Sequence, residues 1–199
     1  MMHSVRELFF GNAFRALDIR YNLAELLQSK AVRQEFDVII IDCPPRLTTG
    51  AVQALCAGSH LLIPTILDQA SAEAVVAFAE EIEGLKAGDV CSHIKYVGIV
   101  GTKVSSNVDR IAERDAKLLI SDALRDKNVS LGLIADSEFI RQSTSLVNNA
   151  DEGIAYLVGG NNPAQQEARQ GIARLGEYVA RHIGLPPQPA FQTSTTQGN

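Results

Sequence analysis

The chain has 199 residues, of which 46% are hydrophobic and 21% are charged, a size and composition typical of one globular domain. This composition excludes collagen-like and coiled-coil proteins, and it excludes intrinsic disorder except at the ends. The 18 basic and 23 acidic residues give a net charge of −5, so the chain has no overall basic character of the kind that binds nucleic acid or anionic membranes.

Cysteine content and apolar run length point to a cellular compartment. Cys43, Cys56 and Cys91 have no C-x-x-C spacing, which predicts neither a disulfide framework nor a zinc site and suits a reducing cytosol. The longest apolar runs, DVIII and HLLIPTIL, are far shorter than the roughly 18 residues of a membrane span, and the N-terminus lacks the apolar core of a signal peptide. We therefore expect a cytoplasmic protein without a membrane partner.

The first half of the chain predicts two strands with helices around them. A weak helical pattern covers residues 12–34, and the β-branched run FDVIIID at 36–42 is typical of a parallel strand that is buried on both faces. A short helix over AVQALCA precedes a second strand, HLLIPTIL, which Pro64 is expected to end early. Ser71 is the expected N-cap of an amphipathic helix that follows.

The second half continues the alternation of strands and helices. The strand IKYVGIVGTKV leads into a helix over 107–127, with Ile111 and Leu118 expected on its buried side, and VSLGLIA is predicted as a fourth strand. Residues 138–149 have a helical pattern. The last helix has Asn162 as its expected N-cap.

The order of elements predicts the fold class and the domain bounds. Strands that alternate with helices need right-handed crossovers, so the class is α/β with a mostly parallel sheet between helical layers. We expect one domain over residues 1–184, with a poorly matched segment at 1–35. The proline-rich tail at 185–199 is expected to be disordered.

Asp42 ends an apolar strand, which is the pattern of a Walker B element whose carboxylate meets Mg²⁺, usually through water. An aspartate that only caps the next turn is the alternative interpretation. The stretches FDVIIIDCPPRLTTGAVQAL and LLIPTILDQASAEAV extend the pattern, and VGIVGTK and SLGLIADSEFIRQS continue it more weakly over about residues 36–183. Its landmarks are Asp42, Cys43, Pro44, Pro45, Ala54, Leu55, Pro64 and Ser71.

This order and spacing resemble the ParA/MinD family of deviant-Walker ATPases. The resemblance implies a P-loop-NTPase-like fold that binds ATP and Mg²⁺. It implies that Asp42 is the catalytic and Mg²⁺-organising residue, and that residues 43–50, with Pro44, form the loop that senses the γ-phosphate. Later strand ends approach the adenine ring in this family, which implies that Thr102, Lys103, Ala135 and Asp136 lie near the base.

The sequence departs from the family pattern at three points. Cys43 stands where Thr or Ser is usual, and Ala135 stands where Pro is common. The phosphate-binding loop K-G-G-x-x-K-[ST] does not occur in the sequence, because GIVGTK at 98–103 has the wrong spacing and Val104 follows its lysine. Without such a loop no run of backbone N–H groups cradles the phosphates. We therefore expect a chain that lacks the family's first β-α unit and does not hydrolyse ATP alone.

Three hypotheses of function follow. The first is a ParA-like chromosome or plasmid partition ATPase-family protein without its phosphate-binding segment. The second is a non-hydrolysing interaction module on the same fold, and the third is an amidoligase-like biosynthetic enzyme, such as the dethiobiotin or cobyrinate enzymes. The resemblance implies four kinds of partner: a second copy, an intact homologue, a ParB-like adaptor and non-specific DNA.

Two expectations concern surfaces. Arg174, Tyr178 and Arg181 share one side of the last helix and are the candidates for DNA contact. An incomplete domain would leave apolar surface beside the DVIII run, so self-association is expected. Crossovers place successive strand ends on one edge of a sheet, and four residues are expected there: Asp42, Asp68, Thr102 and Asp136.

Overall fold

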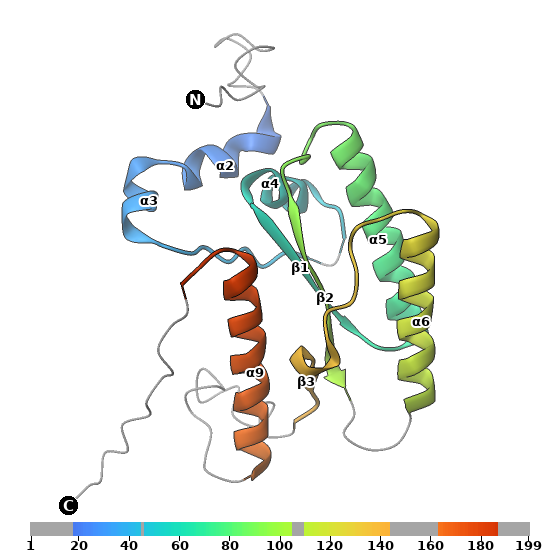
Figure 1. Cartoon of the computed structure of the whole chain (residues 1–199). Helices are drawn as coiled ribbons and strands as arrows, with labels where there is room; N and C mark the ends of the chain where they lie inside the picture. Colours follow the sequence, from blue (N-terminus) through green and yellow to red (C-terminus); the bar gives the residue numbers. More distant parts are fainter. Residues whose placement is uncertain (1–17, 45, 105–109, 144–162, 187–199) are drawn as a thin grey trace, which may run out of the picture.

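The computed structural model of the chain describes residues 18–44, 46–104, 110–143 and 163–186. Its strands stand between helices, with α9 on one side and α5 and α6 on the other (Figure 1). The expected N-cap Asn162 and most of the expected tail lie outside the described residues. In chain order the described elements are η2 (Ile19–Tyr21), α2 (Asn22–Leu27), α3 (Lys30–Glu35), α4 (Thr49–Ala57), β1 (His60–Ile66), α5 (Gln69–Ala87), β2 (Lys95–Val104), α6 (Arg110–Asp126), η3 (Asp136–Glu138), β3 (Ile140–Arg141) and α9 (Pro163–His182).

The described sheet has three parallel strands in the order β1-β2-β3. Ile66 at the end of β1 is level with Thr102 of β2, and Thr102 is level with Ile140 of β3. All three strands therefore run toward one carboxyl edge, and the predicted α/β class with a parallel sheet is confirmed. β1 and β2 occupy the segments that the sequence predicted, HLLIPTIL and IKYVGIVGTKV.

The core lies where α5 and α6 pack together beside the strands. Its large fully buried aliphatic side chains are supplied by α5, β2 and α6, and α9 adds the partly buried Leu175 and Tyr178. The Tyr178 hydroxyl donates a hydrogen bond to the Val97 carbonyl oxygen of β2 at 3.3 Å. Burying such aliphatic side chains stabilises each by about 1.5–3 kcal/mol relative to exposure. The largest of them are Ile82, Ile99, Val100, Ile120 and Leu124.

The expected strand at 36–42 is not a strand in the structure. These residues run from α3 toward α4 without regular secondary structure, and Ile40 is 91% exposed. A strand needs a hydrogen-bonded neighbour, and among the described residues no strand pairs with this segment. The prediction that Asp42 ends a central strand is therefore wrong for the structure described.

Two further strand predictions need correction. β1 continues through Pro64, which is level with Val100. Because β1 is an edge strand of the described sheet, the N–H that Pro64 lacks need not serve the ladder. The predicted strand VSLGLIA forms only an isolated bridge, in which Leu133 pairs with Ile99, while part of the helical pattern predicted at 138–149 is instead the short strand β3.

The helices α5 and α6 differ from expectation in detail. Asp68, not Ser71, is the N-cap of α5, since its carboxylate accepts a hydrogen bond from the Ser71 N–H at 2.7 Å. On α6, Ile111 and Leu118 are 61% and 53% exposed. The buried face of α6 is a different one, because packing against α5, rather than the apolar pattern, selects it. This face consists of Ala116, Ile120 and Leu124.

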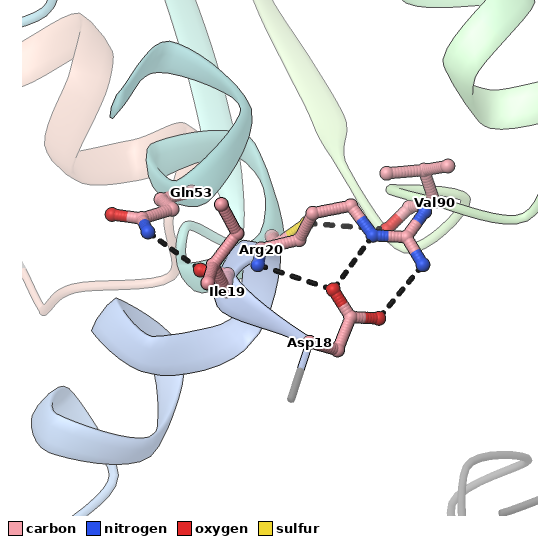
Figure 2. A network of polar contacts seen from close by, with 6 residues as sticks. Asp18, Ile19, Arg20, Gln53 and Val90 are labelled. Carbon is pink, nitrogen blue, oxygen red and sulfur yellow. Dashed lines mark hydrogen bonds and ion pairs between the residues drawn. The ribbon is translucent and has the colours of Figure 1, made fainter. Parts of the chain in front are cut away.

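Figure 2 shows the polar contacts around the segment before α2, of which the one between Gln53 and Ile19 reaches α4. Asp18 binds the Arg20 guanidinium at 2.9 and 2.7 Å, and the Gln53 side-chain amide donates to the Ile19 carbonyl at 2.5 Å. The Cys56 thiol lies 3.5 Å from the Val90 carbonyl. Over its described part, from residue 18 on, the weak helical pattern of residues 12–34 is confirmed as the short helices η2, α2 and α3.

Candidate functional site

The carboxyl edge of the sheet is the place to look for a site, because ligands of open α/β sheets bind beyond the carboxyl ends of the strands. β1 ends there at Ile66, level with Thr102, and β2 continues to Val104. The Thr102 hydroxyl donates to the Thr65 carbonyl at 3.0 Å. Thr102 thus ties the ends of two neighbouring strands together.

Asp68 and Lys103 continue the edge from β1 and β2. Asp68 is exposed, and one of its carboxylate oxygens accepts a hydrogen bond from the Ser71 N–H in the first turn of α5. Lys103 is exposed with a φ of 54°, in the left-handed region that non-glycine residues rarely adopt. Lys103 lies between Thr102 and Val104, where the register between β2 and β3 shifts, so the lysine occupies an irregularity within a strand rather than a phosphate-binding loop.

Asp136 stands in the short helix η3, at the same end of the sheet. Ala135 is the N-cap of η3. The Asp136 carboxylate forms an ion pair with the Lys117 ammonium of α6, with 2.5 Å between Oδ2 and Nζ. The turn is anchored by Phe139, which is 4% exposed. A Cβ built on Gly101 would stand 2.7 Å from the Phe139 ring, so glycine at that position of β2 lets the ring approach the strand.

Two cations hold this turn and were not predicted from the sequence. The Lys117 ammonium lies 5.1 Å from the centre of the Phe139 ring, and Arg174 of α9 donates to the Ser137 carbonyl at 2.9 Å. Lys117 is 19 positions from Asp136 and Arg174 is 37 positions from Ser137. No local pattern could reveal pairs so distant in sequence, since only the packing of α6 and α9 brings them together.

Asp42 and Pro44 are placed apart from this cluster. Both residues are exposed, and Pro44 accepts a hydrogen bond from the Arg46 N–H at 2.8 Å. Within the described residues, no hydrogen bond or ion pair connects Asp42 with Thr102 or Asp136. The structure therefore gathers Thr102, Lys103, Ala135 and Asp136 near one edge, and it does not join Asp42 to them.

Cys43 has no sign of an activated nucleophile. Burial of its sulfur, and then the neighbouring charge of Asp42, raise the pKa of the Cys43 thiol. A raised pKa disfavours the thiolate, which is the reactive form.

The described residues by themselves do not complete a site for ATP and Mg²⁺. No group of three His, Cys, Asp or Glu side chains among them is arranged to hold a metal ion. Asp136 is already paired with Lys117, and the sequence K-G-G-x-x-K-[ST] does not occur in the chain. Over the same residues, no helix combines the length and apolarity of a membrane-spanning segment.

Comparison with known proteins identifies related folds. A family described as an AAA domain matches residues 8–95, whereas no curated protein matches the sequence. Apo McdA of Cyanothece superposes with a TM-score of 0.61 at 17% identity, over 81% of this chain and 59% of that chain. A substituted Cyanothece McdA in complex with ATP superposes with a TM-score of 0.64 at 16% identity, over 86% and 60% of the two chains.

A biosynthetic enzyme shares the fold as well. Cobyrinic acid a,c-diamide synthase from Mycobacterium smegmatis, with a bound ATP analogue and magnesium, superposes with a TM-score of 0.59 at 20% identity, over 88% of this chain and 60% of that chain. The present chain thus spans about 60% of the length of each of these three solved structures.

The parallel sheet, its flanking helices and these neighbours define a P-loop-NTPase-like α/β protein. Within that class, the AAA-domain match and the McdA structures confirm the resemblance to the ParA/MinD-like P-loop ATPases that the residues around Asp42 indicated.

Proposed function

We propose that this chain is a ParA-like partition ATPase-family protein and that its 199 residues do not hydrolyse ATP by themselves. One observation carries the proposal: Asp42, the Walker B aspartate by resemblance, is exposed and stands outside the sheet, in a sequence without K-G-G-x-x-K-[ST]. Phosphoryl transfer depends on positioning and on a fixed electrostatic clamp around the phosphates. Asp42 alone is no such clamp.

The residues at the carboxyl edge of the sheet are assigned to the nucleotide base in this proposal. Thr102 and Asp136 lie near the end of the sheet where nucleotides bind in this fold class, and Lys117 holds the Asp136 turn in place. In this proposal Thr102, Lys103, Ala135 and Asp136 border the base, Pro44 belongs to the γ-phosphate loop, and Asp42 holds Mg²⁺ through water. Bound Mg²⁺ would supply charge neutralisation at the phosphates.

An ATPase assay on the purified chain tests the proposal. We expect phosphate release at background level and the same rate for Asp42→Ala. Asp115→Ala, at an exposed carboxylate of α6, is the matched control for preparation effects. Turnover in the parent chain that Asp115→Ala retains and Asp42→Ala loses would contradict the proposal.

A role in partition also implies DNA as a partner. Of the three candidates for DNA contact, Arg174, Tyr178 and Arg181, two have other contacts in the structure. The Tyr178 hydroxyl is bonded to Val97 and faces the sheet, so Tyr178 does not share an exposed face with Arg181. Arg181 is exposed near the end of α9, whereas Arg174 holds η3. We propose Arg181 as a phosphate contact for non-specific DNA.

Salt-dependent binding tests that contact. A protein that neutralises phosphates with basic side chains loses affinity linearly in log salt, and removing one contact lowers the slope by about 1. Fluorescence anisotropy with duplex DNA should show this change for Arg181→Ala. Arg125→Ala is the control, because Arg125 is paired with Asp122 on α6 at 2.7 Å. An unchanged slope for Arg181→Ala would exclude the contact.

The diamide-synthase neighbour favours a second candidate function, an ATP-dependent amidoligase. The supporting observation is its coverage of 88% of this chain at a TM-score of 0.59. Mass spectrometry of a polycarboxylic acid incubated with ammonia, ATP and the chain would detect an amide product, with the heat-denatured chain as control. A product would favour the amidoligase over the partition protein. Binding of a ParB-like adaptor without nucleotide would instead favour an interaction module.

A further inference from the structure

The segment at residues 131–134 lies beside β2 at one edge of the described sheet. Leu133 makes a parallel bridge with Ile99, on the side of β2 away from β1. Ile99 holds this bridge through backbone hydrogen bonds of 2.8 and 3.0 Å to the residues before and after Leu133. Backbone groups of successive residues in a strand face opposite ways, so those of Leu133, and of Leu131 two positions earlier, face away from β2. Within the described part of the chain, no backbone hydrogen bond involves either leucine.

Gly132 stands in the middle of this edge, where the fold of the chain does not require a glycine. The described glycines with a positive φ are Gly98 and Gly184, and a Cβ built on Gly132 would have no neighbouring atom within 4 Å. A glycine inside a strand often marks a place where another backbone approaches closely. The space over Gly132 is therefore open to a second chain.

A groove of about 450 Å³ lies between this edge and the C-terminal part of α6. Gly132 and Leu133 line it from the edge, and Ser121 and Arg125 line it from the helix. Arg125 is the only charged residue of the lining. Its ion pair with Asp122 is well exposed, at 71% and 55% for the two side chains, so it contributes little and can be exchanged for another carboxylate. A groove between an edge strand and a helix is where an extended peptide can add a strand to a sheet.

We propose that this groove binds an extended segment of another protein, which pairs with the backbone of residues 131–133 and places a carboxylate beside Arg125. The unpaired N–H and C=O groups of the edge are complementary to an extended backbone. The single guanidinium of the lining is complementary to an acidic side chain. The contact needs no nucleotide, so it does not depend on the function proposed above.

The sequence favours another protein over this chain as the source of the acidic segment. Residues 129–135, which a second copy would offer in an edge-to-edge pair, contain no Asp or Glu. The tail at residues 187–199 contains none either. Neither segment supplies an acidic side chain for Arg125.

Fluorescence anisotropy with a labelled peptide, Thr-Val-Thr-Asp-Thr-Val-Thr, tests the proposal. Side chains alternate along a strand, so the aspartate and both valines share one face of this peptide. The purified chain should bind it more tightly than the same peptide with lysine in place of aspartate, and Arg125→Gln should reduce that preference roughly 2- to 30-fold. Equal affinity of the parent chain for the two peptides would contradict the role of Arg125.

Backbone methylation of the peptide tests strand pairing itself. N-methyl groups on alternate residues remove the hydrogen-bond donors of one edge of the peptide and leave those of the other edge. Methylation of one edge should weaken binding roughly 5- to 150-fold, by the loss of about two hydrogen bonds, and methylation of the other edge should not. Equal affinity of the two methylated peptides would overturn the proposal.

A substitution in the lining tests the location. Ser121→Phe fills the groove from α6 and should abolish binding. Gln170→Phe, at an exposed neutral position of α9, is the matched control and should bind like the parent chain. Thermal unfolding confirms that both variants are folded. Equal loss of binding in the two variants would contradict the assignment to this groove.

Amide hydrogen exchange, read by nuclear magnetic resonance, identifies the occupant. The N–H groups of Leu131 and Leu133 should be protected when the peptide is present and unprotected when it is absent. Protection without peptide that grows with protein concentration would overturn the proposal in favour of a second copy. Protection without peptide that is lost on removal of residues 187–199 would overturn it in favour of the tail.

Discussion

Lys117 of α6 and Asp136 of η3 form an ion pair of 2.5 Å that connects a helix beside the sheet with the turn at its carboxyl edge. The Asp136 side chain is 72% exposed and the Lys117 side chain is 26% exposed, so water screens the attraction from one side. The Lys117 ammonium also lies over the Phe139 ring. The pair therefore positions the turn more than it stabilises the fold.

A double-mutant cycle on Lys117 and Asp136 measures this pair. Exposed ion pairs contribute about 0.2–1 kcal/mol, and we expect a coupling energy in that range from urea unfolding of Lys117→Met, Asp136→Asn and the double variant. The coupling should shrink as salt is raised. Arg125 and Asp122, both well exposed on α6, give the reference cycle. A coupling above about 2 kcal/mol would mean that the pair is shielded from solvent.

Gly98 is required by both backbone and space. Its φ is +141°, and a Cβ at this position would lie 2.3 Å from Cγ2 of Ile134. We expect Gly98→Ala to lower the free energy of unfolding by about 1–3 kcal/mol. Gly176→Ala is the opposite case, because it lies in α9 with no atom within 4 Å of the new Cβ, and it should raise stability by up to about 1 kcal/mol. Urea unfolding of the two variants distinguishes a steric requirement from a general effect of alanine.

Asp68 should matter more to α5 than Ser71 does. Asp68→Ala removes the acceptor for the Ser71 N–H and should cost about 0.5–2 kcal/mol, while Asp68→Asn keeps an acceptor and should cost less. Ser71→Ala leaves the N–H in place and should change stability little. Thermal unfolding of the three variants checks the order. A larger loss for Ser71→Ala than for Asp68→Ala would restore Ser71 as the cap.

His60 should make stability fall in mild acid. Burial lowers the pKa of His60, and the charges of Lys95 and His182 lower it further. The folded state thus favours the neutral ring, and the stability this contributes is present above the unfolded pKa of about 6.5 and is lost as the pH falls through the folded value. His60→Gln should reduce the loss of stability between about pH 7 and 5. His93→Gln, at an exposed histidine bonded to the Gly58 carbonyl at 3.0 Å, should keep it.

The alternation of β-branched runs and helical periodicity was enough to predict the α/β class, the strands β1 and β2, and the helices α5, α6 and α9. These features depend on local period and on turn residues, which a sequence displays directly. The resemblance carried by Asp42, Pro44 and Ser71 came from the same kind of local information. The AAA-domain match over residues 8–95 and the fold shared with McdA agree with that resemblance.

Tertiary packing decided what local pattern left open. The run at 36–42 has the composition of a buried strand, yet a strand exists only where another strand supplies hydrogen bonds, and the described sheet supplies none there. On α6 more than one stripe of apolar residues was available, and contact with α5 buried Ile120 and left Leu118 exposed. Lys117 and Asp136 meet because two elements pack side by side. Pairing, burial and charge contact depend on residues distant in the chain, so only the folded arrangement determines them.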